Sequence, residues 1–165
     1  NRTEIYIEGS KEAIDNFVER FEKCHSGPYP NQEENPHIAD EFGADAELFI
    51  DKVGSKWIQI WDEGIYHSSD NRCEIYLDTA WYPPSDMILE IYRQMAEIDD
   101  EIKVSGKYWD EGHQPIGVFE VYYGQIISEE QSIDDDEDQE YFWDDVVAPA
   151  FEILQERLDK VMKEI

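Results

Sequence analysis

The sequence predicts an α+β domain in which helices cover a mostly antiparallel β-sheet. Two patterns predict this class. Short segments with alternating apolar residues are typical of strands, and longer segments with apolar residues three and four apart are typical of helices. The chain has 165 residues, of which 41% are hydrophobic and 13% aromatic. This is enough for one hydrophobic core, so we expect a single folded domain and exclude an acidic disordered chain.

The N-terminal segment predicts a strand followed by a helix. Thr3 to Ile7 alternates, Gly9 ends the strand, and Ser10 is a suitable N-cap for the helix. One apolar stripe then recurs at helical spacing: Ala13, Ile14, Phe17, Val18, Phe21 and Cys24.

The middle of the chain predicts a loop, a hairpin and a second helix. Residues 25–43 are rich in proline and glycine and are expected to form a loop, and residues 46–50 are ambiguous between helix and strand. Residues 57–61 and 73–77 predict two strands joined by a polar turn at 68–71. Pro83 and Pro84 open a helix with a buried stripe, made by Met87, Ile88, Ile91, Tyr92, Met95 and Ile98.

The C-terminal third predicts two more strands and a last helix. Residues 102–108 form a fourth strand, residues 112–115 a turn, and residues 118–123, extended to Ile127, a fifth strand. An acidic linker follows. The last helix begins near Ala148, with Pro149 in its first turn. Its apolar face is expected to hold Val147, Ala150, Phe151, Leu154, Leu158, Val161 and Ile165.

The first six elements follow the order of a split βαβ, or ferredoxin-like, arrangement with its helices on one sheet face. We therefore expect the stripes of the first two helices to pack on the same face. An added strand and a C-terminal helix complete the domain. Residues 1–127 form the ferredoxin-like core, and residues 128–165 form the acidic linker and the helix packed on the same domain.

Three motifs resemble a known family. They are Gly54-Ser55-Lys56-Trp57, Leu77-Asp78-Thr79-Ala80-Trp81-Tyr82-Pro83-Pro84, and Tyr108-Trp109-Asp110-Glu111-Gly112 with Gly117 before Val118-Phe119-Glu120. Together they are similar to the YubB-like family, small ferredoxin-like proteins carried by phages and plasmids. The resemblance covers roughly residues 54 to 124 and implies the fold and a mobile-element origin. It supplies no catalytic residues. The acidic balance and the Asp/Glu-rich tail depart from the family pattern.

The composition excludes several functions. There are 41 Asp and Glu against 13 Lys and Arg, which gives a formal charge of -28. Such a field repels phosphate, so direct nucleic-acid binding through a basic surface is excluded. No apolar run is long enough for a membrane span. Cys24 and Cys73 are expected to be reduced thiols in the cytoplasm of a host cell, although a single bridge between them stays open as an alternative.

Catalytic and metal motifs are not apparent. The chain contains no nucleophile elbow, phosphate-binding loop, dinucleotide fingerprint or zinc-protease motif, so we expect neither an enzyme nor a cofactor. The four histidines lack metal-ligand spacing. Asp134, Asp136, Asp138 and Asp145 fit part of a calcium-loop register, but Gln139 replaces its glycine and the final glutamate is missing.

The acidic charge is the distinctive signal. Between Ser128 and Asp145 there are ten acids in eighteen residues and no Lys or Arg. A net charge of about two to eight is enough for solubility, and a larger one costs stability through self-repulsion. A binding role is therefore expected for these acids and a second cluster. The candidate partner-binding residues are Glu129, Glu130, Asp134, Asp135, Asp136, Glu137, Asp138, Glu140, Asp144, Asp145, Asp99, Asp100 and Glu101.

These observations favour a phage- or mobile-element-type inhibitor that acts without catalysis. At about 1.7 Å of duplex axis per charge, the net charge matches roughly 48 Å of DNA. We therefore hypothesise that the protein mimics DNA and occupies the DNA site of a basic host defence protein, such as a restriction or CRISPR-type nuclease. Two alternatives stay open: an acidic protein-interaction module without mimicry, and a divalent-cation-binding protein. Homodimerisation is left open.

Overall fold

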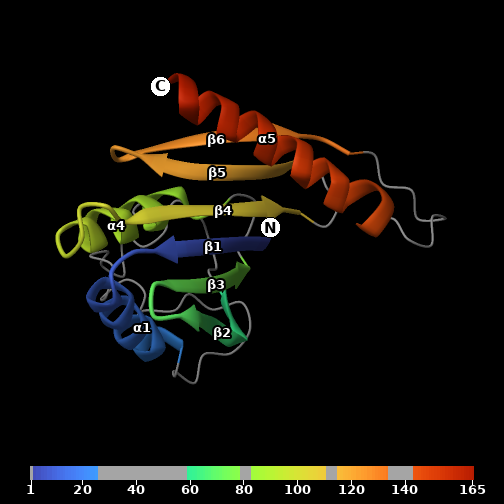
Figure 1. The fold of residues 1–165 in the computed structure, drawn as a ribbon. Coiled ribbons are helices and arrows are strands. Elements are labelled where there is room, and N and C mark those ends of the chain that lie inside the picture. Colours follow the sequence, from blue (N-terminus) through green and yellow to red (C-terminus); the bar gives the residue numbers. More distant parts are fainter. Residues whose placement is uncertain (1, 26–58, 79–82, 111–114, 134–142) are drawn as a thin grey trace.

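The fold is an α+β arrangement with a six-stranded antiparallel sheet and three helices in the described part of the chain (Figure 1). The computed structural model describes residues 2–25, 59–78, 83–110, 115–133 and 143–165. The sheet contains β1 (Arg2–Glu8), β2 (Gln59–Ser69), β3 (Arg72–Asp78), β4 (Lys103–Trp109), β5 (Ile116–Tyr122) and β6 (Gln125–Gln131), in the order β2-β3-β1-β4-β5-β6. The helices are α1 (Lys11–His25), α4 (Ser85–Ala96) and α5 (Ala148–Glu164). A π-helical turn, η1 (Trp143–Val147), leads into α5.

The two predicted helix stripes pack on the same face of the sheet, as expected. Ala13, Ile14, Phe17 and Phe21 of α1 share one core with Met87, Ile88, Ile91 and Met95 of α4 and with the inward side chains of β1 and β3. The rings of Phe17 and Phe21 stack 5.5 Å apart within this core. Cys73 is a free, buried thiol of the same core, and burial raises its pKa to about 12.

The helix starts follow the predicted signals. The Ser10 hydroxyl accepts a 3.2 Å hydrogen bond from the amide of Ala13, so Ser10 is the N-cap of α1. Helix α4 begins directly after Pro84, and α5 begins at Ala148 with Pro149 in its first turn. The apolar face of α5 is shorter than predicted, because Ile165 is 53% exposed.

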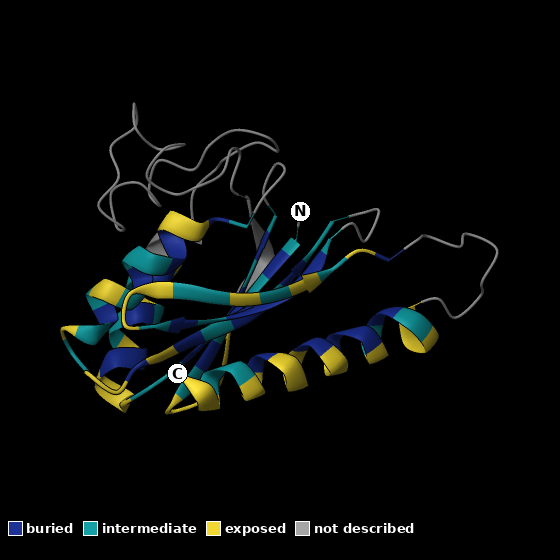
Figure 2. Ribbon diagram, turned by 90° about the horizontal axis from the view of Figure 1, so that it is seen from above, coloured by how far each residue is buried: buried dark blue, intermediate teal, exposed yellow. Residues whose placement is uncertain are grey.

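The C-terminal helix covers the opposite face of the sheet from α1 and α4 (Figures 1 and 2). Phe119 and Val121 of β5 point into the first core, whereas Ile116 and Val118 pack against Phe151 and Leu154 of α5. Strand β5 is therefore buried on both faces. This arrangement departs from the prediction that helices cover one face only.

The predicted fifth strand is two strands. The chain turns at Tyr123 and Gly124, both of which have a positive φ, of 46° and 78°. This is the backbone of a tight two-residue hairpin turn. The return strand β6 takes up Ser128–Gln131, which the sequence had assigned to the acidic linker. The expected loop at 25–43 and turn at 112–115 lie outside the described residues except for His25, which is the last residue of α1, and Pro115; the ambiguous segment at 46–50 lies wholly outside them.

Candidate functional site: an acidic end of the sheet

Five register partners on five neighbouring strands form a row across one end of the sheet. Several acids lie at this end. Asp78, Arg2, Trp109, Ile116 and Gln131 are successive register partners on β3, β1, β4, β5 and β6. The ends of β3, β4 and β6 and the starts of β1 and β5 therefore lie together. We call this the acidic end and define it by the acids beside the row on the β4, β6 and α5 side: Asp110, Glu129, Glu130, Asp144 and Asp145.

Aromatic packing holds the start of α5 at this end. The Trp143 ring lies 5.2 Å from the Trp109 ring and 6.2 Å from that of Phe151, and the Trp109 and Phe151 rings are 5.9 Å apart. Because Trp143 is fixed against the end of β4, the next two residues, Asp144 and Asp145, are held there as well. Both are exposed, so their carboxylates face solvent.

Glu130 is fixed by a hydrogen bond from the sheet. The Tyr108 hydroxyl donates to a carboxylate oxygen of Glu130 at 2.6 Å. Burial raises the pKa of Tyr108, and the hydrogen bond to Glu130 raises it further, so the phenol stays a donor throughout the physiological pH range. Since side chains alternate along a strand, the neighbouring Glu129 points to the other face. Strand β6 thus presents acids on both faces.

Basic residues are missing from the sequence around the acidic end. No Lys or Arg occurs from Tyr108 to Glu156. The same stretch contains fifteen acids: Asp110, Glu111, Glu120, Glu129, Glu130, Asp134, Asp135, Asp136, Glu137, Asp138, Glu140, Asp144, Asp145, Glu152 and Glu156. This pattern was available in the sequence and would have added five acids to the predicted set: Asp110, Glu111, Glu120, Glu152 and Glu156.

Acids elsewhere on the sheet have basic partners. On the face of β1 and β3 that points away from α1 and α4, Arg72 pairs with Glu8 and with Glu74, the latter at 3.3 Å. On the same face the ammonium of Lys107 lies 3.6 Å from Glu4. At the row itself, Arg2 pairs with Asp78 at 3.2 Å. Lys107 also borders the acidic end, because its ammonium lies 5.9 Å from the Trp109 ring and 5.3 Å from the Phe151 ring.

The second predicted cluster lies at the other end of the sheet. Asp99, Asp100 and Glu101 precede β4, whose first residue, Lys103, pairs in register with Glu8. A seven-residue strand spans about 20 Å, so this cluster is about that far from the acidic end. Asp99 also has a structural role, because its carboxylate accepts hydrogen bonds from the amides of Ser10 at 2.7 Å and Glu101 at 3.0 Å.

The structure therefore places Glu129, Glu130, Asp144 and Asp145 at one end of the sheet, with Glu129 and Glu130 on opposite faces, and separates them from Asp99, Asp100 and Glu101. The other predicted acids, Asp134, Asp135, Asp136, Glu137, Asp138 and Glu140, lie outside the described residues, as does most of the calcium-loop register. Among the side chains that are described, no group of three His, Cys, Asp or Glu residues is arranged to hold a metal ion.

Comparisons with known proteins give no relative: no protein-family model, curated protein or solved structure matches the chain. Among the described helices, none is long and apolar enough to cross a membrane. The geometry and charge of the acidic end are therefore the basis for the functional proposal.

Proposed function

We propose that the protein is an acidic inhibitor that binds the DNA-binding surface of a basic host defence protein by mimicking DNA. The observation that carries the proposal is the acidic end, where Glu130, held by Tyr108, and the exposed Asp144 and Asp145, which follow the packed Trp143, lie in a stretch of sequence without basic residues. A surface of this kind attracts the Lys and Arg side chains that line DNA-binding grooves. Inhibition by occupation of a site needs no catalysis.

The density of acids in the sequence supports mimicry over a solubility role. DNA carries about one charge per 1.7 Å of axis, so the length of one strand of this sheet, about 20 Å, corresponds to roughly twelve phosphate charges. The structure places five acids at the acidic end, in a sequence stretch that holds fifteen acids and no base; one of the fifteen, Glu120, pairs with Lys103 at 3.9 Å. The Glu130 carboxylate, which the Tyr108 hydroxyl holds, also loses little side-chain entropy on binding.

We also propose that the first six elements, β1, α1, β2, β3, α4 and β4, form a ferredoxin-like unit of mobile-element origin, with β5, β6 and α5 as additions. The strand order β2-β3-β1-β4 and the antiparallel pairing of β1 with both β3 and β4 support the ferredoxin-like proposal. The resemblance to the YubB-like family supports the origin. In this view the additions carry most of the acidic end, so the inhibitory surface was added to an older scaffold.

The proposal is tested by neutralising the acidic end. The variant Glu129→Gln, Asp144→Asn, Asp145→Asn removes three charges and leaves the hydrogen bond between Tyr108 and Glu130 in place. A host protein captured from lysate by the wild type and then purified is the binding partner in the assay. Affinity for it should fall about tenfold, mainly through slower association, because long-range attraction sets the encounter rate.

A matched control removes three charges elsewhere. Glu12→Gln, Glu19→Gln, Glu22→Gln changes three exposed acids on the outer side of α1. This variant should bind almost as well as the wild type. Equal losses from both variants would mean that total charge, not the acidic end, drives binding. A further variant shows whether the acidic run also contributes to affinity for the partner. It neutralises Asp134, Asp135, Asp136, Glu137 and Asp138.

A further inference from the structure

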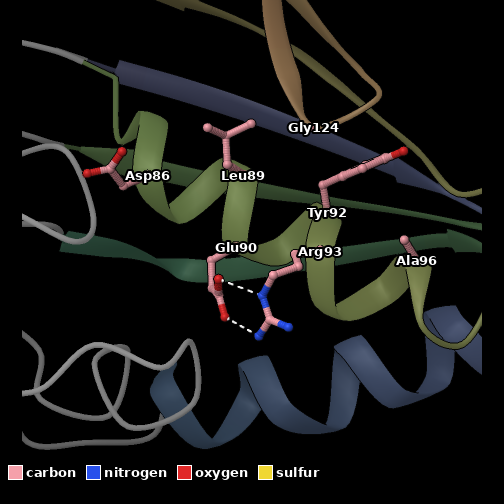
Figure 3. Close-up of a pocket in the computed structure, with 7 residues that line it drawn as sticks. All are labelled: Asp86, Leu89, Glu90, Tyr92, Arg93, Ala96 and Gly124. Atoms are coloured by element: carbon pink, nitrogen blue, oxygen red, sulfur yellow. Dashed lines mark hydrogen bonds and ion pairs between the residues drawn. The ribbon is translucent and has the colours of Figure 1, made fainter.

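Helix α4 has a second apolar stripe that lies outside its buried face. Its core stripe consists of Met87, Ile88, Ile91 and Met95. Leu89, Tyr92 and Ala96 are spaced by three and four residues and are half-buried, so they form a neighbouring stripe on the same helix. Figure 3 shows Leu89 and Tyr92 directed toward the side of the helix on which Gly124 lies.

This stripe lines one side of a groove of about 640 Å³. Gly124, at the turn between β5 and β6, lines the other side (Figure 3). The volume lies within the range of about 300–1,000 Å³ that is usual for ligand pockets. Asp86 and Glu90 stand at the rim, and the carboxylate of Glu90 binds the Arg93 guanidinium through hydrogen bonds of 2.6 and 3.0 Å. The rim cation is therefore already neutralised by a neighbour.

Strand β6 runs from this groove along the edge of the described sheet. It pairs with β5 through Gln125 to Gln131 and is the last strand in the sheet order. An edge strand exposes backbone donors and acceptors that another extended chain can use. A groove that joins an edge strand to the apolar side of a helix is the geometry in which peptides add to a sheet as an extra strand.

We propose that this groove and the edge of β6 bind an extended basic segment of a partner protein. The segment's backbone pairs with β6, one of its apolar side chains enters the groove against Leu89, Tyr92 and Ala96, and its Lys or Arg side chains face Asp86 and the acids of β6. Charge selects the occupant, because a protein with a charge of -28 attracts basic segments and repels acidic ones and second copies of itself. The groove lies at the sheet end opposite the acidic end, and a segment paired along β6 reaches Glu129 and Glu130 of the acidic end. The two proposals share these acids, but strand pairing in the groove does not require DNA mimicry.

The probe is a capped seven-residue peptide, Lys-Val-Lys-Leu-Lys-Val-Lys, titrated into the isotope-labelled full chain. Amide signals of residues 124–131 and 89–96 should shift together, with a Kd of roughly 100 μM. The same peptide with alternate amides N-methylated cannot complete the strand ladder and should bind at least about tenfold more weakly. A peptide with Glu in place of Lys should not bind.

Two protein variants separate the groove from nonspecific attraction. Leu89→Ser should weaken binding of the lysine peptide about fivefold, since it removes apolar contact from the groove. Ile153→Ser is the control, because Ile153 is 49% exposed on α5 and lies outside the groove. Unchanged binding by the folded Leu89 variant, equal binding of the N-methylated peptide, or no shifts at about 1 mM peptide would each overturn the proposal.

Discussion

Tyr108 and Glu130 lie on strands that are not neighbours, yet their side chains are joined by a 2.6 Å hydrogen bond. Gly117 of β5, the register partner of both residues, lies between them. The Tyr108 ring passes directly over this glycine, where a Cβ atom would lie 2.2 Å from the ring. The same arrangement occurs two residues away on β4 and β5, where the Phe119 ring lies over its register partner Gly106. Two glycines thus allow two aromatic rings to lie flat on the sheet.

Replacing Gly117 with alanine should destabilise the protein by about 2–4 kcal/mol, because the new methyl group displaces the Tyr108 ring and breaks its hydrogen bond to Glu130. Urea denaturation measures this loss. Tyr108→Phe is the reference, since it removes only the hydroxyl and should cost less. A Gly117→Ala variant as stable as the wild type would contradict this account of the sheet.

Stability should fall at alkaline pH. Burial and hydrogen bonds to Glu4, Glu74 and Glu130 raise the pKa of Tyr6, Tyr76 and Tyr108 above the ordinary value of 10.0. Above about pH 10 these phenols ionise in the unfolded chain but stay protonated in the folded one, so stability falls as pH rises, by less than about 1.4 kcal/mol per pH unit for each phenol because none of the three is fully buried. Tyr76 lies nearest the surface and contributes least. Urea unfolding at pH 9 and pH 11 measures the loss. The Tyr6→Phe variant should show a shallower decline, and an identical decline would exclude Tyr6 as a source.

Tyr123→Asn should stabilise the protein by about 0.5–1 kcal/mol. Tyr123 has a φ of 46° and is 81% exposed, and asparagine adopts this backbone conformation more readily than tyrosine. Thermal unfolding detects the gain, with Tyr123→Phe as a neutral control. A lower melting temperature for the asparagine variant would show that the Tyr123 ring, which lies 4.6 Å from that of Tyr122, contributes more than the turn costs.

Calcium and magnesium should bind only weakly and at several sites. The described side chains offer no group of three ligands, and scattered carboxylates bind divalent cations loosely. Differential scanning calorimetry should show a gain in melting temperature no larger than sodium chloride gives at equal ionic strength. Saturable binding at one site tighter than about 10 μM, measured by isothermal titration calorimetry, would favour the cation-binding alternative.

Local patterns in the sequence were enough to predict β1, the pairing of β2 with β3, and the starts of α1, α4 and α5. Each carries a periodic apolar stripe or a specific cap such as Ser10. The strand predicted at 57–61 was too short, since β2 continues to Ser69. The break between β5 and β6 was missed because Tyr123 is a strand-forming residue, although Gly124 is a turn signal.

Two features depend on tertiary contacts and could not be read from local pattern. Residues 128–131 looked like an acidic linker, because an edge strand needs few buried side chains. The Asp99 carboxylate accepts a hydrogen bond from the amide of Ser10, the N-cap of α1. These residues are 89 positions apart, so no local pattern predicts the contact. The position of α5 was indicated in the sequence, because Val118 and Phe119 are adjacent apolar residues. Both are buried, which is typical of a strand covered on both faces.

The most direct test of the central claim is competition between this protein and duplex DNA for the purified partner. If the acidic end substitutes for phosphates, the two ligands exclude each other, and the apparent Kd for DNA rises in proportion to the concentration of the inhibitor. The affinity of the inhibitor should also weaken as salt rises, since charge attraction is screened within about 8 Å at physiological ionic strength. A ternary complex of partner, DNA and inhibitor at saturating DNA would contradict mimicry and leave a separate acidic docking role.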